Sequence, residues 1–348
     1  MSKIKFESIQ SNFKILNPFK DFAEESHLVE VRRDPLLGDT SVYNPFYKDK
    51  AKYYFGECDA ELVRVLVEGS AKNCIFCGER VGKVTAQYPP DVIPDGRIRV
   101  GEAILFANLY GAGKYHPVIS LSSAHFLKLS EFAPELIGNG LRAAQKFLNM
   151  VYAKDRSALY SVVSANYLFP AGASLVHPHL QMLVTPMAYS YHERIIDTSL
   201  TYYQKNNSSY YSDLIEEEKK NGSRYIVQRG GWHLLTAFSP MGSNEVIAVH
   251  EKECDLGLLS EADLSDLSGG ISRVLSFYES LGHLSFNFSL FSVRKSPKEG
   301  FHCLLKMITR QNLYPNYRND DYFLQKMLHS ELIINTPEEL AQKIQAYF

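Results

Sequence analysis

Apolar and polar residues alternate in the segment HLQMLVTP, which begins at His179. Successive side chains of a β-strand point to opposite faces of its sheet. A strand here would place Leu180, Met182 and Val184 on one apolar face, with His179 and Gln181 on the other. A histidine beside a glutamine on this background is compatible with a positioned nucleophile, with half of a metal site, or with a buried polar pair.

The sequence before this segment predicts further strands and one long helix. Strands are expected at residues 98–108, 115–121 and 159–165, the first with a central turn. Ser130 is a candidate N-cap for a helix that runs to about Ala153, with apolar residues at helical spacing. Residues 1–27 are expected to form an irregular or helical lead-in, and residues 29–45 two short strands around a turn. The polar residues 190–224 predict a solvated helix and loop.

The second half of the chain repeats this outline. Its matching elements are strands at residues 231–238 and 246–249, a helix opened by Ser260, and a strand at 286–293. A terminal helix begins at the N-T-P-E-E segment, where Thr336 is the N-cap. Repetition of this kind predicts a duplicated unit. We expect an α+β fold of two repeats, with antiparallel sheets and packed helices, divided into residues 1–200 and 201–348.

The two repeats differ at the residues that could carry chemistry. The segment HCLLK, residues 302–306, takes the place of HPHLQ, residues 177–181. Leu304 therefore stands at the position of His179, and Lys306 at that of Gln181. We expect the first repeat to keep an active histidine and the second to be degenerate.

Composition narrows the classes of partner. The chain has 348 residues, with 37 basic and 39 acidic side chains and a net charge of −2, so a nucleic-acid polyanion is not an expected partner. The N-terminal residues lack the apolar core of a signal peptide, and no run reaches membrane-spanning length. Five scattered cysteines do not form a disulfide framework, and a cytoplasmic location is expected.

The CIFC segment contains two of these cysteines, Cys74 and Cys77. A C-x-x-C pair brings two thiolates within reach of one ion, but a structural zinc site needs four ligands. The sequence has no second C-x-x-C pair, so two ligands would have to come from elsewhere. A redox pair and two unrelated buried thiols are the alternatives.

Two strand–strand–helix–strand units, one of them containing HPHxQ, resemble a tandem histidine-triad protein, and nearly the whole chain resembles the galactose-1-phosphate uridylyltransferase family. The family-like motifs occur in family order: RRDPLLG from Arg32, CIFC, Asn108, S-x-x-H at 122–125, Asn166, G-x-S at 172–174, HPHxQ and N-T-P-E-E. By themselves, Arg32 and Arg33 would more often be surface charges than phosphate contacts, and within this ordered set of motifs both a surface role and a substrate contact stay open.

The resemblance implies a role for each matching residue. His179 would be the nucleophile that carries a nucleoside monophosphate as a covalent adduct. Phosphate oxygens would be held by Gln181 and Ser174, with Asn166 orienting the phosphoryl group, Gly172 allowing close backbone approach and Asn108 lying near the nucleoside. The implied structural zinc ligands are Cys74, Cys77, His125 and His177.

The implied activity is transfer of a nucleoside monophosphate, UMP in the first instance, between a nucleotide sugar and a sugar 1-phosphate, as in galactose metabolism. Neutral histidine can attack phosphorus, and fixed donors can stabilise the charge that develops. Alternatives are a nucleotide-sugar or dinucleotide-polyphosphate phosphorylase with the same histidine, and a non-catalytic, zinc-stabilised nucleotide-binding protein. The family is typically homodimeric.

The sequence departs from the family at its second metal site. His302 is kept, but Leu304 replaces the second histidine of the H-x-H pair, and Glu193 matches the family glutamate only with a gap. We therefore expect no iron site. Residues 320–332 also differ from the family's hexose-recognition segment, so the resemblance does not identify galactose 1-phosphate as the acceptor.

Overall fold

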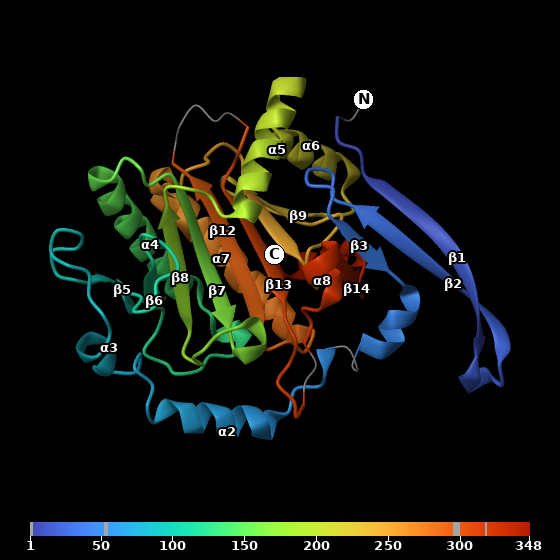
Figure 1. The fold of residues 1–348 in the computed structure, drawn as a ribbon, viewed down its shortest axis with the longest axis horizontal. Coiled ribbons are helices and arrows are strands. Elements are labelled where there is room, and N and C mark those ends of the chain that lie inside the picture. Colours follow the sequence, from blue (N-terminus) through green and yellow to red (C-terminus); the bar gives the residue numbers. More distant parts are fainter. Residues whose placement is uncertain (1–2, 52–54, 295–299, 317–318) are drawn as a thin grey trace.

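The centre of the protein is a ten-stranded antiparallel sheet with the strand order β4-β5-β6-β8-β7-β12-β13-β11-β10-β9 (Figure 1). The computed structural model describes residues 3–51, 55–294, 300–316 and 319–348. The strands of this sheet are β4 (Ile98–Val100), β5 (Ala103–Ala107), β6 (Pro117–Ser120), β7 (Tyr160–Tyr167), β8 (His179–Thr185), β9 (Tyr225–Arg229), β10 (Trp232–Thr236), β11 (Val246–His250), β12 (Phe286–Val293) and β13 (Leu304–Thr309). The predicted α+β class, with antiparallel sheets and packed helices, is confirmed.

The two halves of the sheet have equivalent strand orders. From one edge to the centre the order is β4-β5-β6-β8-β7, and from the other edge to the centre it is β9-β10-β11-β13-β12. Strands β7 and β12 meet there, and Ser164 of β7 lies opposite Ser289 of β12, with their hydroxyl oxygens 2.9 Å apart. This is the order that a duplicated unit would give, and the duplication itself stays an interpretation. The proposed division into residues 1–200 and 201–348 also stays a prediction, and both parts contribute strands to one continuous sheet.

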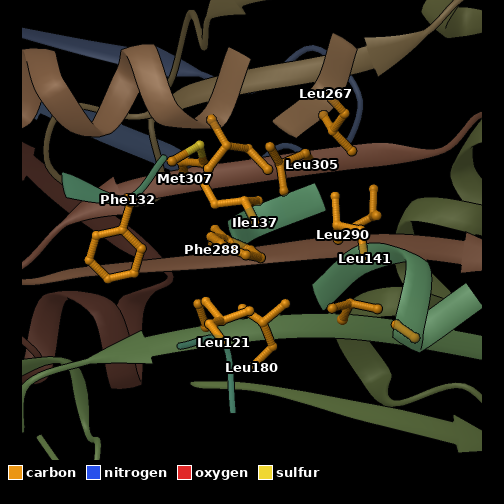
Figure 2. Packing of buried hydrophobic residues seen from close by; sticks show 14 of the residues in the cluster. Leu121, Phe132, Ile137, Leu141, Leu180, Leu267, Phe288, Leu290, Leu305 and Met307 are labelled. Atoms are coloured by element: carbon orange, nitrogen blue, oxygen red, sulfur yellow. The ribbon is translucent and has the colours of Figure 1, made fainter. Parts of the chain in front are cut away.

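Two long helices, α4 (Pro134–Lys154) and α7 (Glu261–Ser280), pack against each other and share the main core with one face of the sheet. In Figure 2, Leu121 and Leu180 lie on one side of this core, with Leu305 and Met307 on the other. The apolar face expected for β8 is confirmed, because Leu180, Met182 and Val184 are buried there.

The predicted helix start at Ser130 is wrong, although that at Ser260 is confirmed by a capping box. Helix α4 begins at Pro134, and residues Leu129–Glu131 form a separate 3₁₀ turn. A residue before proline is disfavoured from the helical region, and Ala133 accordingly has ψ of 146°. The proline therefore delays the start of the helix.

The N-terminal residues form a long hairpin, so the prediction of an irregular or helical lead-in is wrong. Strand β1 (Glu7–Asn17) pairs with β2 (Ala23–Arg33) along its whole length. They belong to a second sheet of order β1-β2-β3-β14, completed by β3 (Thr40–Tyr43) and β14 (Ser330–Ile333). The strand–turn–strand arrangement predicted for residues 29–45 is confirmed.

The polar residues 190–224 form two helices, α5 (Ser190–Asn206) and α6 (Tyr210–Asn221), rather than one helix and a loop. Their apolar side chains cover the face of the second-half strands opposite α7, where Leu235, Ile247 and Leu304 are buried. The corresponding face of the first half carries His179 and Gln181.

The remaining helices lie outside the ten-stranded sheet. They are α2 (Ala60–Ala71), α3 (Arg80–Lys83), α8 (Phe323–Leu328) and α9 (Pro337–Ile344), the last with the predicted capping box at Thr336. Among the described residues, no helix combines the length and the apolar character that crossing a bilayer requires.

Candidate active site and metal cluster

Four predicted metal ligands from distant parts of the chain meet in one cluster. The ligand atoms of Cys74, Cys77, His125 and His177 all lie within 4.8 Å of one another. The sulfur of Cys77 is 3.3 Å from Nδ1 of His125 and 3.4 Å from Nδ1 of His177, and the sulfur of Cys74 is 3.7 Å from the same His177 nitrogen. A tetrahedral zinc ion would set neighbouring sulfur and nitrogen ligands about 3.5 Å apart. The cluster therefore has the dimensions of a site that could hold a metal such as zinc.

The hydrogen bonds around the two histidines orient the correct nitrogen toward the cysteines. Nε2 of His177 lies 2.8 Å from the carbonyl oxygen of Ser122, which only accepts, so Nε2 carries the proton. Nε2 of His125 lies 2.9 Å from Oγ of Ser70, whose own proton goes to the carbonyl of Leu66. Both Nδ1 atoms are left with a lone pair directed into the cluster, which is the usual supporting arrangement for metal-bound histidines.

Burial also sets the protonation of the cluster. Burial lowers the pKa of His177 to about 4, so its imidazole is neutral near pH 7, as a ligand must be. The pKa of the Cys77 thiol rises to about 11, mainly through burial and further through Cys74. A cation between the two sulfurs would favour the thiolates that these pKa values otherwise disfavour.

His179 is the first residue of β8 and is 7 % exposed. Its Nδ1 lies 2.8 Å from the backbone carbonyl oxygen of His177, so Nδ1 donates and the lone pair is on Nε2. Burial lowers the pKa of His179, which favours the neutral imidazole. The structure thus gives His179 a fixed tautomer with one nucleophilic nitrogen.

Gln181 is held by His116, which immediately precedes the neighbouring strand β6 and was missed from the sequence. The backbone N–H of Ala112 donates to Nδ1 of His116 at 2.9 Å, so the proton of His116 is on Nε2. That Nε2 lies 2.9 Å from Oε1 of Gln181 and donates to it. The NH₂ of Gln181 consequently faces away from β6. The alternation of side chains along a strand could have indicated this role. His116 lies two residues before Val118 and so on the same face, and Val118 pairs with Gln181.

The pairing of β7 with β8 ends at Ala165 and Leu180, and Asn166 and His179 are the next residues of the two strands. Its Oδ1 accepts a hydrogen bond of 2.7 Å from Nδ2 of Asn287 on β12. Asn108 follows β5, where its Oδ1 accepts from the backbone N–H of Tyr110 and its Nδ2 lies 3.3 Å from Nε2 of His116. The structure therefore places Gln181 on β8, Asn166 on the neighbouring strand β7, and Asn108 at the end of β5, which is separated from β8 by β6.

The segment from residue 169 to residue 174 is a turn before the HPHxQ motif. Residues Phe169–Ala171 form a 3₁₀ turn, and Gly172 follows with φ of 84°, a conformation that favours glycine. Gly172 and Ser174 are exposed, whereas His177 and His179 are buried. Apart from its two chain neighbours, none of the residues that the structure describes has a heavy atom within 4 Å of the position a Cβ would take on Gly172, so the constraint there is the backbone angle rather than the space.

Other candidate residues occupy structural positions. Arg32 is 7 % exposed and forms ion pairs with Glu30 and Glu338, so it is not a surface charge, whereas Arg33 is exposed and donates to the carbonyl of Gly38. His302 is buried between the carbonyl of His250 and the hydroxyl of Ser209. Leu304 is buried, and Glu193 is exposed on α5.

Comparison with known proteins finds chains of similar sequence. An uncharacterized protein of Archaeoglobus fulgidus is 28% identical over 322 residues, which cover 92% of each chain. An ADP-glucose phosphorylase of Arabidopsis thaliana is 24% identical over 201 residues, covering 52% of this chain and 55% of that protein. No family model matches the chain.

Solved structures extend the likeness to the fold. A structure of an ADP-glucose phosphorylase from Arabidopsis thaliana with bound ADP-glucose has a TM-score of 0.68 at 18% identity, covering 91% of this chain and 98% of that one. A uridylyltransferase has a TM-score of 0.64 at 18% identity, covering 76% and 88%. The chain has the fold of the galactose-1-phosphate uridylyltransferase family. The resemblance expected from the sequence is therefore confirmed at the level of the fold.

Proposed function

We propose that the protein is a nucleotidyltransferase that carries a nucleoside monophosphate on Nε2 of His179. The observation that carries this proposal is the 2.8 Å hydrogen bond from Nδ1 of His179 to the carbonyl of His177, which leaves Nε2 as a neutral nucleophile. Names of similar proteins support the reaction class, since one is a uridylyltransferase and another an ADP-glucose phosphorylase.

The reaction would proceed by two displacements. Nε2 of His179 attacks the α-phosphorus of a nucleotide sugar, a P–N bond forms, and the P–O bond to the sugar 1-phosphate breaks. An oxygen of a second phosphate compound then attacks the same phosphorus and displaces the histidine. Negative charge on the phosphoryl oxygens would be met by the NH₂ groups of Gln181 and Asn166, with the backbone at Gly172 and the hydroxyl of Ser174 nearby in the chain. Asn108 is assigned to the nucleoside side.

The base and the acceptor define two versions of this proposal. A sugar 1-phosphate as acceptor, with UMP transferred, would make the protein a hexose-1-phosphate uridylyltransferase. Inorganic phosphate as acceptor would make it a nucleotide-sugar phosphorylase, and the 24% identity to an ADP-glucose phosphorylase favours this second candidate specifically. Both versions use the same histidine.

We further propose that Cys74, Cys77, His125 and His177 hold a structural zinc ion, because two thiolates and two imidazoles in a closed tetrahedron suit zinc. When bound, the ion would cross-link the CIFC segment to His125, in the loop after β6, and to His177, two residues before β8. All four protein ligands are accounted for, so the ion would have no open position for substrate.

A homodimer is proposed from the surface of the N-terminal hairpin. Every residue of β1 except the last is exposed, including Ile9 at 70% and Leu16 at 62%, and Phe19 at the hairpin end is 92% exposed. Apolar side chains gathered on a projecting hairpin are typical of an interface. The protein is expected to act in the cytoplasm as such a dimer.

The test is to incubate the protein with UDP-glucose or ADP-glucose labelled on the α-phosphate. Acid-labile label on the wild-type protein that disappears in His179→Asn is the expected result. Label that survives this substitution, or no label from either nucleotide sugar, would overturn the proposal. The labelled protein is then mixed with unlabelled glucose 1-phosphate or with inorganic phosphate. The compound that removes the label rapidly is the acceptor of the reaction. Tight nucleotide binding with neither adduct nor exchange would instead indicate a non-catalytic binding protein.

A further inference from the structure

A chain of polar side chains runs from the second half of the protein to the side of His179. Arg310, which follows β13, donates from Nη1 to Oδ1 of Asn287 at 2.7 Å. Asn287 on β12 donates from Nδ2 to Oδ1 of Asn166 on β7 at 2.7 Å. Arg310 is itself held by Asp320, with Nε 2.7 Å from Oδ2. This series of hydrogen bonds therefore crosses from β12 to β7, the two strands at the centre of the sheet.

The direction of these hydrogen bonds is fixed at the arginine. A guanidinium group donates and never accepts, so Asn287 must turn its oxygen toward Arg310. Its NH₂ then faces the other way, toward Asn166, which must in turn present its own oxygen to Asn287. This order follows from the chemistry of arginine and holds whichever way each amide is first drawn.

The consequence for the active site is an oriented donor. Strands β12 and β8 flank β7 on opposite sides, so an Asn166 amide whose oxygen faces β12 presents its NH₂ toward β8, where His179 stands. A phosphoryl group on Nε2 of His179 carries negative charge and needs donors rather than acceptors. A reversed Asn166 amide would place an oxygen against that charge.

We propose that Arg310 and Asn287 are positioning residues that set the polarity of Asn166, so that its NH₂ faces the phosphoryl group on His179. This inference rests on the proposed nucleotidyl transfer. It gives the second half of the chain, which lacks the reactive histidine, a direct part in the reaction of the first half.

Asn287 makes a second contact that has to be separated from this one. Its Nδ2 also donates to the carbonyl oxygen of Ala171 at 2.9 Å, in the turn that precedes Gly172. A substitution at Asn287 could therefore act through that turn instead of through Asn166. A double-mutant cycle distinguishes the two, because effects that pass through Asn166 disappear once its amide is removed.

The test uses Asn287→Asp, which keeps the size of the side chain and its acceptor for Arg310 but replaces the NH₂ with an oxygen. Asn166 then has to reverse its amide to donate to residue 287. We expect the rate of adduct formation with the labelled nucleotide sugar to fall about 100-fold, the loss typical of one removed oxyanion donor, with the melting temperature close to wild type. In an Asn166→Ala background, the same substitution is expected to change the rate by less than about twofold.

The controls separate positioning from general damage. Arg310→Lys retains a charged donor and is expected to recover most of the rate that Arg310→Met loses. Asn335→Asp makes the matched change in another amide pair, where Asn335 donates to Oδ1 of Asn244 at 3.1 Å, and is expected to leave the rate near wild type. We call the series of hydrogen bonds from Arg310 through Asn287 to Asn166 the relay. Equal loss of rate in Arg310→Lys and Arg310→Met would count against the relay.

Failure of the relay and failure of the proposed function give different results. A wild-type protein that takes no label from any nucleotide sugar overturns the proposed function and the relay with it. A labelled wild type with an Asn287→Asp variant that reacts at the same rate overturns the relay alone. Additive losses in the double variant would assign Asn287 to the turn at Ala171 and also overturn the relay.

Discussion

His177 and His179 are joined by a hydrogen bond from Nδ1 of His179 to the backbone carbonyl oxygen of His177, 2.8 Å long. The imidazole of the same His177 points into the cluster with Cys74 and Cys77. One residue thus connects the candidate metal site with the candidate nucleophile, through its side chain on one side and its main chain on the other. Movement of the cluster would change the orientation of the reactive imidazole.

Removal of the proposed zinc ion is therefore expected to slow the proposed reaction as well as to destabilise the fold. Cys77→Ser should lose most of its bound metal, melt at a lower temperature, and form the His179 adduct about tenfold more slowly or worse, because the His177 carbonyl that orients His179 would be held less firmly, and hydrogen bonds that orient such a group are worth about 10- to 100-fold. Metal content by mass spectrometry and single-turnover labelling check this. Cys254→Ser, which changes a cysteine outside the cluster, should keep both metal and rate. An unchanged rate in metal-depleted protein would contradict the coupling.

His116 is predicted to control the orientation of Gln181. Its Nε2 proton goes to Oε1 of Gln181, which sends the glutamine NH₂ toward the side where Asn166 stands. His116→Ala should let the amide rotate and slow adduct formation about tenfold or more, whereas His116→Asn can retain a donor and should be affected less. Single-turnover rates measure both, with thermal melting as the check on folding. Indistinguishable rates for the two variants would speak against this role.

The pH dependence of stability should reflect buried histidines away from the metal cluster. Burial lowers the pKa of His283 to about 4, and that of His233 to about 4. Because these pKa values lie below the unfolded value near 6.5, the unfolded chain binds more protons, and stability present above pH 6.5 is lost as the pH falls toward 4. Each such histidine contributes a slope of up to about 1.4 kcal/mol per pH unit in that window.

Urea unfolding at pH 7, 6 and 5 measures this slope. His283→Gln is expected to have a smaller loss of unfolding free energy between pH 6.5 and 4 than the wild type, by up to the contribution of one proton. A slope that is unchanged by the substitution would show that His283 does not titrate in this way.

The hairpin surface leads to a prediction about assembly. Ile9→Lys combined with Leu16→Lys should convert the proposed dimer to a monomer, because two charges would have to be buried in an apolar interface. Light scattering coupled to gel filtration reads the mass directly. Val65→Lys on α2 is the matched control, since Val65 is 53% exposed on a different surface. A wild-type protein that already runs as a monomer would dismiss the dimer.

The sequence predicted the structure best where burial of one face makes apolar residues recur at a regular spacing. Strand β8 with its apolar face and the second-half strands follow from apolar residues that recur at fixed spacing, and the start of α7 follows from the capping pair Ser260 and Asp263. The hairpin β1–β2 was missed because β1 buries neither face, so its side chains have no need to alternate. Helix α4 was started too early because the effect of Pro134 on Ala133 outweighed the capping potential of Ser130.

Part of the candidate site could also be predicted from the sequence. The metal cluster and the HPHxQ motif consist of residue types that are rare together, so their order in the chain carried the information. His116, Asn287 and Arg310 belong to no motif, and their contacts depend on which strands are neighbours. Only the register of β6, β8, β7 and β12 brings them beside Gln181 and Asn166.

The pairing of β7 with β12 also determines the order in which the site is completed during synthesis. The cluster ligands and His179 all lie within the first 179 residues, whereas Asn287 and Arg310 are translated more than 100 residues later. A nascent chain can therefore assemble its metal-binding half long before the strand that orients Asn166 has left the ribosome. Contacts between segments so distant in sequence form slowly. The growing polypeptide could thus bind the proposed metal first, and its full reaction rate would be reached only when the last third of the chain has docked.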